Sequence, residues 1–150
     1  MTRWLDDAEQ DAWRQLAGVM TRLPAALDAQ LQRDADLSHF GYWVLAMLSE
    51  APDRSLRMSE LADRANASLS RLSHGVGRLE KQGWVRRERT AQDGRGTVAV
   101  LTEQGLAKVV ATAPGHVEQV RRLVFDGLDA EDVRRLAELG RTLLRQVDAG

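Results

Sequence analysis

The sequence predicts a mainly α-helical chain with a small β-wing, arranged as a winged helix-turn-helix between N- and C-terminal helices. Three observations predict this fold. Apolar residues recur every three or four positions near both ends of the chain. Two short helical segments follow each other closely at 59–64 and 68–82, and a strand-like pair at 84–89 and 97–101 encloses a glycine-containing turn. We therefore expect a single domain over 1–150, with the winged helix-turn-helix at about 38–102 and dimerisation helices at about 1–35 and 103–150.

The bulk composition excludes several classes of protein. With 43% apolar and 29% charged residues and only three prolines, the 150-residue chain is expected to fold rather than remain disordered. The absence of cysteine excludes disulfides, thiolate zinc sites and thiol redox sensing. The N-terminus lacks the apolar run of a signal peptide, and no stretch approaches the roughly 18 apolar residues of a membrane span. We expect a cytoplasmic protein with no membrane association.

The net charge of −1 conceals a basic middle between acidic ends. Ten Lys and Arg residues but only five Asp and Glu residues lie between Arg54 and Thr97, whereas the rest of the chain holds 11 basic and 17 acidic residues. Such an asymmetry is typical of a protein that presents one face to phosphate.

The first two helices are predicted from their apolar stripes. The first runs from about residue 6 to 33, and Pro24 inside it should kink or divide it. Ser38 is the expected N-cap of a second helix that stops at Ala51-Pro52. The two stripes consist of Trp13, Leu16, Met20, Leu23, Leu27 and Leu31, and of Phe40, Val44, Met47 and Leu48.

The helix-turn-helix follows at once. Ser59 is the expected cap of a helix that ends at Arg64, and Ser68 is the expected cap of a helix that runs to Gln82. Gly83 then supplies the C-terminal glycine.

A β-hairpin and two helices complete the chain. Residues 90–96 are the predicted hairpin tip. Thr102 should cap a long helix that bends near Pro114 and reaches about Phe125, and a last helix follows Asp129. Its apolar stripe contains Val133, Leu136, Leu139, Leu143 and Val147, which a small monomer could not easily cover, so we expect a homodimer.

The second helix of the helix-turn-helix carries the chemistry of a DNA reader. On a helical wheel its buried face holds Leu69, Leu72, Val76 and Leu79, and its opposite face holds Ser70, Arg71, His74, Gly77, Arg78 and Lys81, with no carboxylate. Arg71 lies where the helix dipole is positive, so a phosphate or a guanine edge should compensate it, although a merely solvated arginine is the alternative. Gly75 and Gly77 weaken this helix, and they either permit close approach of a neighbour or are simply tolerated.

Arginines concentrate on the wing. Arg86, Arg87 and Arg89 lie on its first strand and Arg95 at its tip, where Asp93 can orient Arg95 across the turn. These guanidinium groups would bind phosphates or enter a narrow minor groove. The alternative is that the hairpin is charged and merely solvated.

Several fragments in this order resemble the signature of MarR-type transcriptional regulators. They are Ser59-Glu60-Leu61-Ala62, Ser68, Ser70, Val76-Gly77-Arg78-Leu79-Glu80, Gly83-Trp84-Val85, Asp93-Gly94-Arg95 and Val100-Leu101-Thr102-Glu103-Gln104-Gly105. The resemblance implies that 68–82 reads the major groove, that Arg95 steadied by Asp93 enters the minor groove, and that the terminal helices interlock with a second subunit. The glycine pair in the reading helix, and Gly94 where a second basic residue is common, depart from the family pattern.

The resemblance also implies a repressor that releases DNA when a small aromatic or anionic effector binds between the dimerising and DNA-binding regions. Trp13, His39, Trp43 and Trp84 are candidates for that cleft, although aromatic residues at such positions are more often core. The expected DNA contacts are Ser68, Ser70, Arg71, Ser73, His74, Arg78, Lys81, Arg87, Arg89, Asp93 and Arg95, on a near-palindromic double-stranded operator with half-sites roughly 34–36 Å apart.

Enzymatic function is not expected. Ser73 and His74 point about 100° apart on a helix, which is poor geometry for a nucleophile and its base. The three histidines are scattered, and no metal motif or phosphate-binding glycine loop is present, so neither a metal nor a cofactor is predicted. The main alternative is a winged-helix module that binds another protein and not DNA.

Overall fold

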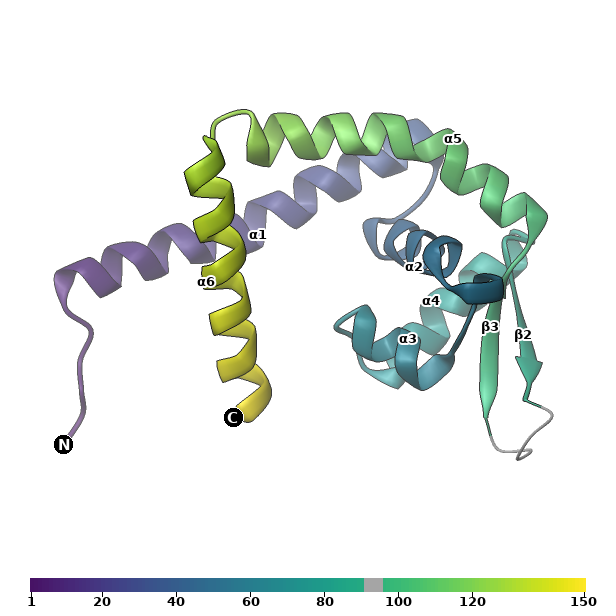
Figure 1. Ribbon diagram of the computed structural model, residues 1–150, viewed down its shortest axis with the longest axis horizontal. Helices are drawn as coiled ribbons and strands as arrows, with labels where there is room; N and C mark the ends of the chain where they lie inside the picture. Colours follow the sequence, from purple (N-terminus) through teal and green to yellow (C-terminus); the bar gives the residue numbers. More distant parts are fainter. Residues whose placement is uncertain (91–95) are drawn as a thin grey trace. The chain divides into compact units, whose positions relative to one another are not determined.

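The computed structural model describes residues 1–90 and 96–150 (Figure 1). These residues form two compact units, Met1–His116 and Val117–Gly150. The described part is mostly helical with one small sheet, which confirms the predicted fold class. Within it, no helix is both long enough and apolar enough to cross a bilayer.

The first unit begins with the long helix α1 (Asp7–Ala35). Asp6 and Glu9 form a capping box at its start, and Asp36 closes it in the left-handed conformation with a φ of 50°. Pro24 lies inside α1 but does not divide it, so that alternative was wrong. Of the predicted stripe only Leu27 and Leu31 are buried within the chain.

Helix α2 (His39–Glu50), the 3-10 turn η1 (Pro52–Arg54), α3 (Met58–Arg64) and α4 (Leu69–Lys81) follow. The predicted cap Ser38 is confirmed, because its hydroxyl accepts from Gly41 N at 2.9 Å. Ser68 likewise accepts from Arg71 N at 3.1 Å, and Gly83 adopts a φ of +79° just past α4. The prediction for Ser59 was wrong: α3 begins at Met58 without a side-chain cap, because the preceding strand leads directly into it.

The sheet has three antiparallel strands in the order β1-β3-β2, where β1 is Ser55–Arg57, β2 is Val85–Arg89 and β3 is Thr97–Leu101. Strands β2 and β3 confirm the predicted wing, which projects from the helices in Figure 1. Strand β1 was not predicted, because three residues are too few to show an alternating pattern and its pairing with β3 is non-local.

The core of the first unit lies where α2, α3 and α4 meet the sheet. Its largest fully buried side chains include Leu31, Leu45, Leu48, Leu61 and Leu72. Helix α4 contributes Leu72, Val76 and Leu79, as predicted, but Leu69 is 56% exposed. The prediction that Leu69 is buried was therefore wrong. Leu69 lies on the same face as Leu72, but it is the first residue of α4 and precedes the part of the helix that packs on the core.

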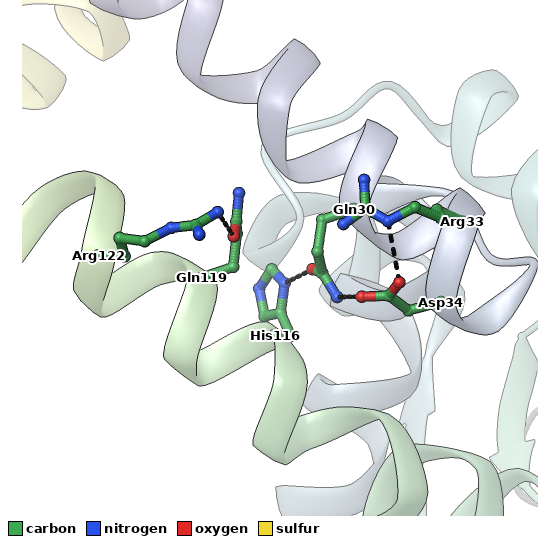
Figure 2. Close-up of polar contacts among 6 residues, drawn as sticks. All are labelled: Gln30, Arg33, Asp34, His116, Gln119 and Arg122. Carbon is green, nitrogen blue, oxygen red and sulfur yellow. Dashed lines mark hydrogen bonds and ion pairs between the residues drawn. The ribbon is translucent and has the colours of Figure 1, made fainter.

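Helix α5 (Glu103–Val120) follows the sheet and continues unbroken through Pro114. Its predicted cap is confirmed, since Thr102 Oγ1 accepts from Gly105 N at 3.0 Å and donates to Gly83 O at 2.6 Å. Two contacts join α5 to α1: Lys108 Nζ donates to Ala35 O at 2.6 Å, and the buried His116 lies 3.3 Å from Gln30 Oε1 (Figure 2).

The second unit contains the end of α5, a π-helical turn over Arg121–Phe125 and α6 (Ala130–Ala149). Within the turn region Arg122 donates to Gln119 at 2.5 Å (Figure 2). The last helix follows Asp129 as predicted, and Asp129 caps it through a capping box with Asp132. Every residue of α6 except the half-buried Gly140 is exposed, including its apolar stripe.

Candidate nucleic-acid interface

Helix α4 presents a polar face opposite its buried residues. Ser70, Arg71, His74, Arg78 and Lys81 are all exposed, whereas Leu72, Val76 and Leu79 are buried. The first turn contains no acidic residue, so the backbone N–H groups at its start are not offset by a carboxylate within the helix. The face therefore offers hydrogen-bond donors and positive charge to an anionic partner.

Arg71 stacks on an aromatic ring at the start of α4. Its guanidinium carbon lies 4.5 Å from the centroid of Phe40 on α2, which is the distance of a cation–π contact. Stacking leaves the edge of the guanidinium available for hydrogen bonds while it restricts the side chain to one direction.

Three more cations on this side lack an acidic partner. Arg78, Lys81 and Arg89 are exposed and form no ion pair with any residue that the structure describes. Other arginines of the chain do pair with carboxylates. Arg54, for example, pairs with Glu103, and Arg64 pairs with Glu60. Unpaired cations on one helix and the adjoining strand are the arrangement that phosphates neutralise.

Arg87 and Ser73 differ from the prediction that they face DNA. The Arg87 guanidinium is bonded within the protein, to Glu80 at 2.7 Å, to Ser73 Oγ at 2.9 Å and to Ser73 O at 3.1 Å. Both side chains point between β2 and α4, because alternation along β2 turns Arg87 toward the helix. The predicted wing-tip residues Asp93 and Arg95 lie outside the described residues.

A pocket of about 1020 Å³ adjoins the polar face. Residues of α1, α2 and α4 line it, together with Trp84 before β2. Three of the four predicted cleft residues, His39, Trp43 and Trp84, meet there, and so do Arg71, His74, Arg78 and Lys81 of α4. The pocket thus combines aromatic surfaces with positive charge, beside the carboxylates of Asp28 and Asp36.

Trp13 does not line this pocket and is 55% exposed. It precedes Pro24, the first α1 residue on the pocket wall, by about 16 Å of helix at 1.5 Å per residue. The assignment of Trp13 to an effector cleft therefore remains a prediction from the sequence.

His39, which lines the pocket, lies beside His116, with ring centroids 5.8 Å apart. Burial lowers the pKa of His39, which Asp28 partly offsets, and burial together with the nearby His39 lowers the pKa of His116. The Tyr42 ring lies tilted against His116, with centroids 4.5 Å apart, and burial raises the pKa of its hydroxyl. Among the described residues, no three acidic or histidine side chains group as metal ligands would.

Solved structures of known regulators superpose on nearly the whole chain. The chain is 48% identical to Sco3205, a MarR family transcriptional regulator from Streptomyces coelicolor crystallised in complex with DNA, with a TM-score of 0.94 over 97% of this chain and 91% of that one. It is 40% identical to AbsC, another MarR family regulator from the same organism, with a TM-score of 0.93 over 99% of this chain and all of AbsC. The chain belongs to the MarR family.

The match of the MarR family model falls on the region just described, residues 42–96. A curated relative from Bacillus subtilis (strain 168), the HTH-type transcriptional repressor YetL, is 28% identical over 95 residues, or 63% of this chain. That match spans 57% of the length of YetL. The resemblance seen in the sequence is therefore confirmed.

The sequence analysis did not predict the contacts that three residues make in this MarR-family site. Phe40 was assigned to a core stripe, yet it is half-buried and holds Arg71. Glu80 was seen only as part of the family signature, and its partner Arg87 is seven residues away on another element. Lys108 lies 4.9 Å from the ring centroid of Trp84 and bonds to the end of α1. None of these pairings has a signal in local spacing.

Proposed function

We propose that this MarR-family chain is a homodimeric, sequence-specific double-stranded DNA-binding regulator, and that it acts as a repressor which a small molecule releases. The observation that supports this most strongly is the exposed face of α4, which carries Arg71, Arg78 and Lys81 without acidic partners among the described residues. The names of its relatives describe transcriptional regulators, and not enzymes, which supports a non-catalytic role in the cytoplasm.

On DNA, each part of the face has a distinct role. Ser70, Arg71 and His74, near the start of α4, reach base edges in the major groove, as the N-terminal residues of reading helices do. Arg78, Lys81 and Arg89 bind phosphates, which fixes register without reading sequence. Ser68 contributes mainly by capping α4. The assignment of Arg95 and Asp93 to the minor groove remains a prediction from the sequence.

A second copy of the chain is the proposed partner of the exposed apolar residues in the terminal helices. Along α6 the exposed fractions of Leu136, Leu139 and Val147 are 47%, 62% and 74%, and on α1 Val19 and Met20 are 54% and 52% exposed. Faces of this kind are covered in soluble proteins. A two-fold dimer would present two α4 helices to half-sites roughly 34–36 Å apart on a near-palindromic operator.

The pocket is the proposed effector site. Its aromatic residues His39, Trp43 and Trp84 and its α4 cations suit a small aromatic anion. Because Arg71 and Arg78 line the pocket and belong to the proposed DNA-binding face, a bound anion would compete with DNA for them. The finding that Sco3205 was crystallised with DNA supports the DNA partner, and the name of YetL supports repression.

Binding to duplexes selected from a random-sequence library by the protein itself tests the proposal. We expect affinity to fall steeply as the salt concentration rises. Arg78→Ala should weaken binding and reduce the slope of log affinity against log salt by about 0.9, the value for one phosphate contact. Arg71→Ala should relax base preference at one position. The matched control is Arg33→Ala, which removes an exposed arginine from the end of α1. A flat salt response, or unchanged binding by both α4 variants, would instead favour a protein partner.

A further inference from the structure

We infer that Arg87 is a positioning residue: through Glu80 and Ser73 it fixes the reading helix α4 to the wing strand β2, and it does not contact DNA. The inference rests on the proposed DNA binding and says which of the wing arginines serves the geometry of that site. It assigns Glu80, an acidic residue beside a surface that must bind phosphate, to the same task.

The contacts of Arg87 use all three guanidinium nitrogens. Nε donates to Glu80 Oε1 at 2.7 Å, Nη1 donates to Ser73 Oγ at 2.9 Å, and Nη2 donates to Ser73 O at 3.1 Å. Glu80 and Ser73 are seven residues apart, so one guanidinium spans two turns of α4. The Arg87 and Glu80 side chains are 30% and 35% exposed, so solvent screens this pair less than the surface pairs elsewhere in the chain.

The surface of α4 is shaped to admit this guanidinium. A Cβ atom at Gly77 would lie 3.3 Å from Arg87 Nη2, tighter than ordinary van der Waals contact. Glycine in the interior of a helix costs about 1 kcal/mol relative to alanine, so the helix gives up stability at the position where Arg87 packs. This contact provides a structural role for one of the two glycines that depart from the family pattern.

The pairs on β2 separate by face. Val85 is buried and Arg87 points to α4, whereas Arg86 and Glu88 lie on the opposite face, are exposed and pair with each other at 2.6 Å. Arg86 and Glu88 thus provide an arginine and a glutamate on the same strand that form no hydrogen bond or ion pair with α4 among the described residues. They serve as matched controls for Arg87 and Glu80.

Glu80→Gln distinguishes two roles for Glu80, a purely electrostatic effect on DNA binding and the positioning of α4, because the two predict opposite changes in affinity. Removal of a negative charge beside the DNA-binding face should raise affinity if electrostatics alone acts, and should raise it further if it frees Arg87 for a phosphate. If Glu80 and Arg87 position α4, affinity for the selected duplex should instead fall by about tenfold, the size of one lost base contact. Glu88→Gln makes the same charge change on the other face and should leave affinity unchanged or slightly higher.

The salt dependence of Arg87→Met provides a second, independent readout. Loss of a phosphate contact lowers the slope of log affinity against log salt by about 0.9, whereas loss of positioning lowers affinity with the slope retained. We expect Arg87→Met to keep the slope, Arg89→Met to reduce it, and Arg86→Met to change neither. The double variant Glu80→Arg with Arg87→Glu restores an ion pair of reversed polarity and should recover part of the affinity lost in Arg87→Glu.

All affinities are measured well below the unfolding transition of each variant, so a loss of folded protein does not enter them. Higher affinity in Glu80→Gln, or a reduced salt slope in Arg87→Met, overturns the inference and makes Arg87 a DNA contact. If the wild-type protein selects no duplex at all, the proposed function fails first, and that outcome is distinct from either result on the variants.

Discussion

At the scale of single residues, a few side chains decide where α4 lies. Gly75 faces the ring of Phe40 on α2, and Phe40 in turn carries the guanidinium of Arg71. Near the other end of α4, Arg87 bonds to Glu80 and Ser73. The same helix that presents donors outward is thus held by specific contacts on two sides.

Gly75→Ala should destabilise the fold although alanine is the better helix former. A Cβ atom there would lie 2.7 Å from Phe40 Cε1. The gain in helix propensity is about 1 kcal/mol, whereas overpacking costs about 1–3 kcal/mol, so we expect a net loss of about 1 kcal/mol in the free energy of unfolding measured with urea. Phe40→Leu in the same chain should relieve the clash. The double variant should therefore lose less free energy of unfolding than the sum of the losses of the two single variants. Simple additivity would contradict the proposed contact.

The His39 and His116 pair should make stability depend on pH. Burial lowers both pKa values below the ordinary 6.5 in the folded chain. As pH falls through 6.5 the unfolded chain therefore takes up protons first, so the free energy of unfolding should be full above about pH 6.5 and decline below it.

Urea unfolding on both sides of this pH measures the effect. His116→Gln should flatten the decline, because glutamine does not titrate, whereas His74→Gln, which removes an exposed imidazole, is the matched control. An equally steep decline in His116→Gln and in the wild-type protein would show that the pH dependence arises elsewhere.

At the scale of elements, side-chain caps define where the helices begin. Ser38, Ser68 and Thr102 each accept from a backbone N–H three residues on, and Asp6 and Asp129 form capping boxes. The starts of α2 and α4 depend on their caps most directly, because neither first turn holds an acidic residue to complement the helix dipole.

Ser68→Ala should lower the free energy of unfolding by about 1 kcal/mol, the usual cost of removing a serine N-cap. Its hydroxyl is the acceptor for Arg71 N at 3.1 Å, and alanine leaves that donor to solvent. Ser70→Ala, an exposed serine two residues later, is the control and should change stability little. Chemical denaturation followed by circular dichroism compares the two, and equal effects would argue against the cap.

At the scale of the whole molecule, the terminal helices expose more apolar surface than a single chain needs. All described residues of α6 except Gly140 are exposed, although its stripe has the spacing of a buried face. The proposed second subunit accounts for this surface, and it also supplies the second reading helix.

Leu139→Glu should convert the protein to a monomer and weaken DNA binding at the same protein concentration, because one reading helix would then bind alone. Sedimentation velocity measures the oligomeric state, and titration of the selected duplex measures affinity. Ala149→Glu adds the same charge at the end of α6, on the side away from the apolar stripe, and should leave both unchanged. A wild-type monomer at micromolar concentration would contradict the dimer.

The elements that could be predicted are those whose signals are local. The caps of α2 and α4 and the αL glycine Gly83 each depend on residues within a turn of one another, and the structure confirms them. Predictions failed where a partner far along the chain decides the outcome. Strand β1 exists because β3 pairs with it, and Ser59 is no cap because β1 runs into α3.

The sequence by itself determined the order of the helices and of the two wing strands, the caps Ser38, Ser68 and Thr102, and the donor-rich face of α4, because helical periodicity and caps act over a few residues. Only the tertiary structure decided that Arg87 turns inward to Glu80 and Ser73, that Phe40 carries Arg71, and that Trp13 stays away from the pocket. The physical reason is that a strand has two faces, and the sequence does not show which of them a helix covers. Which face Arg87 takes depends on the helix that packs there.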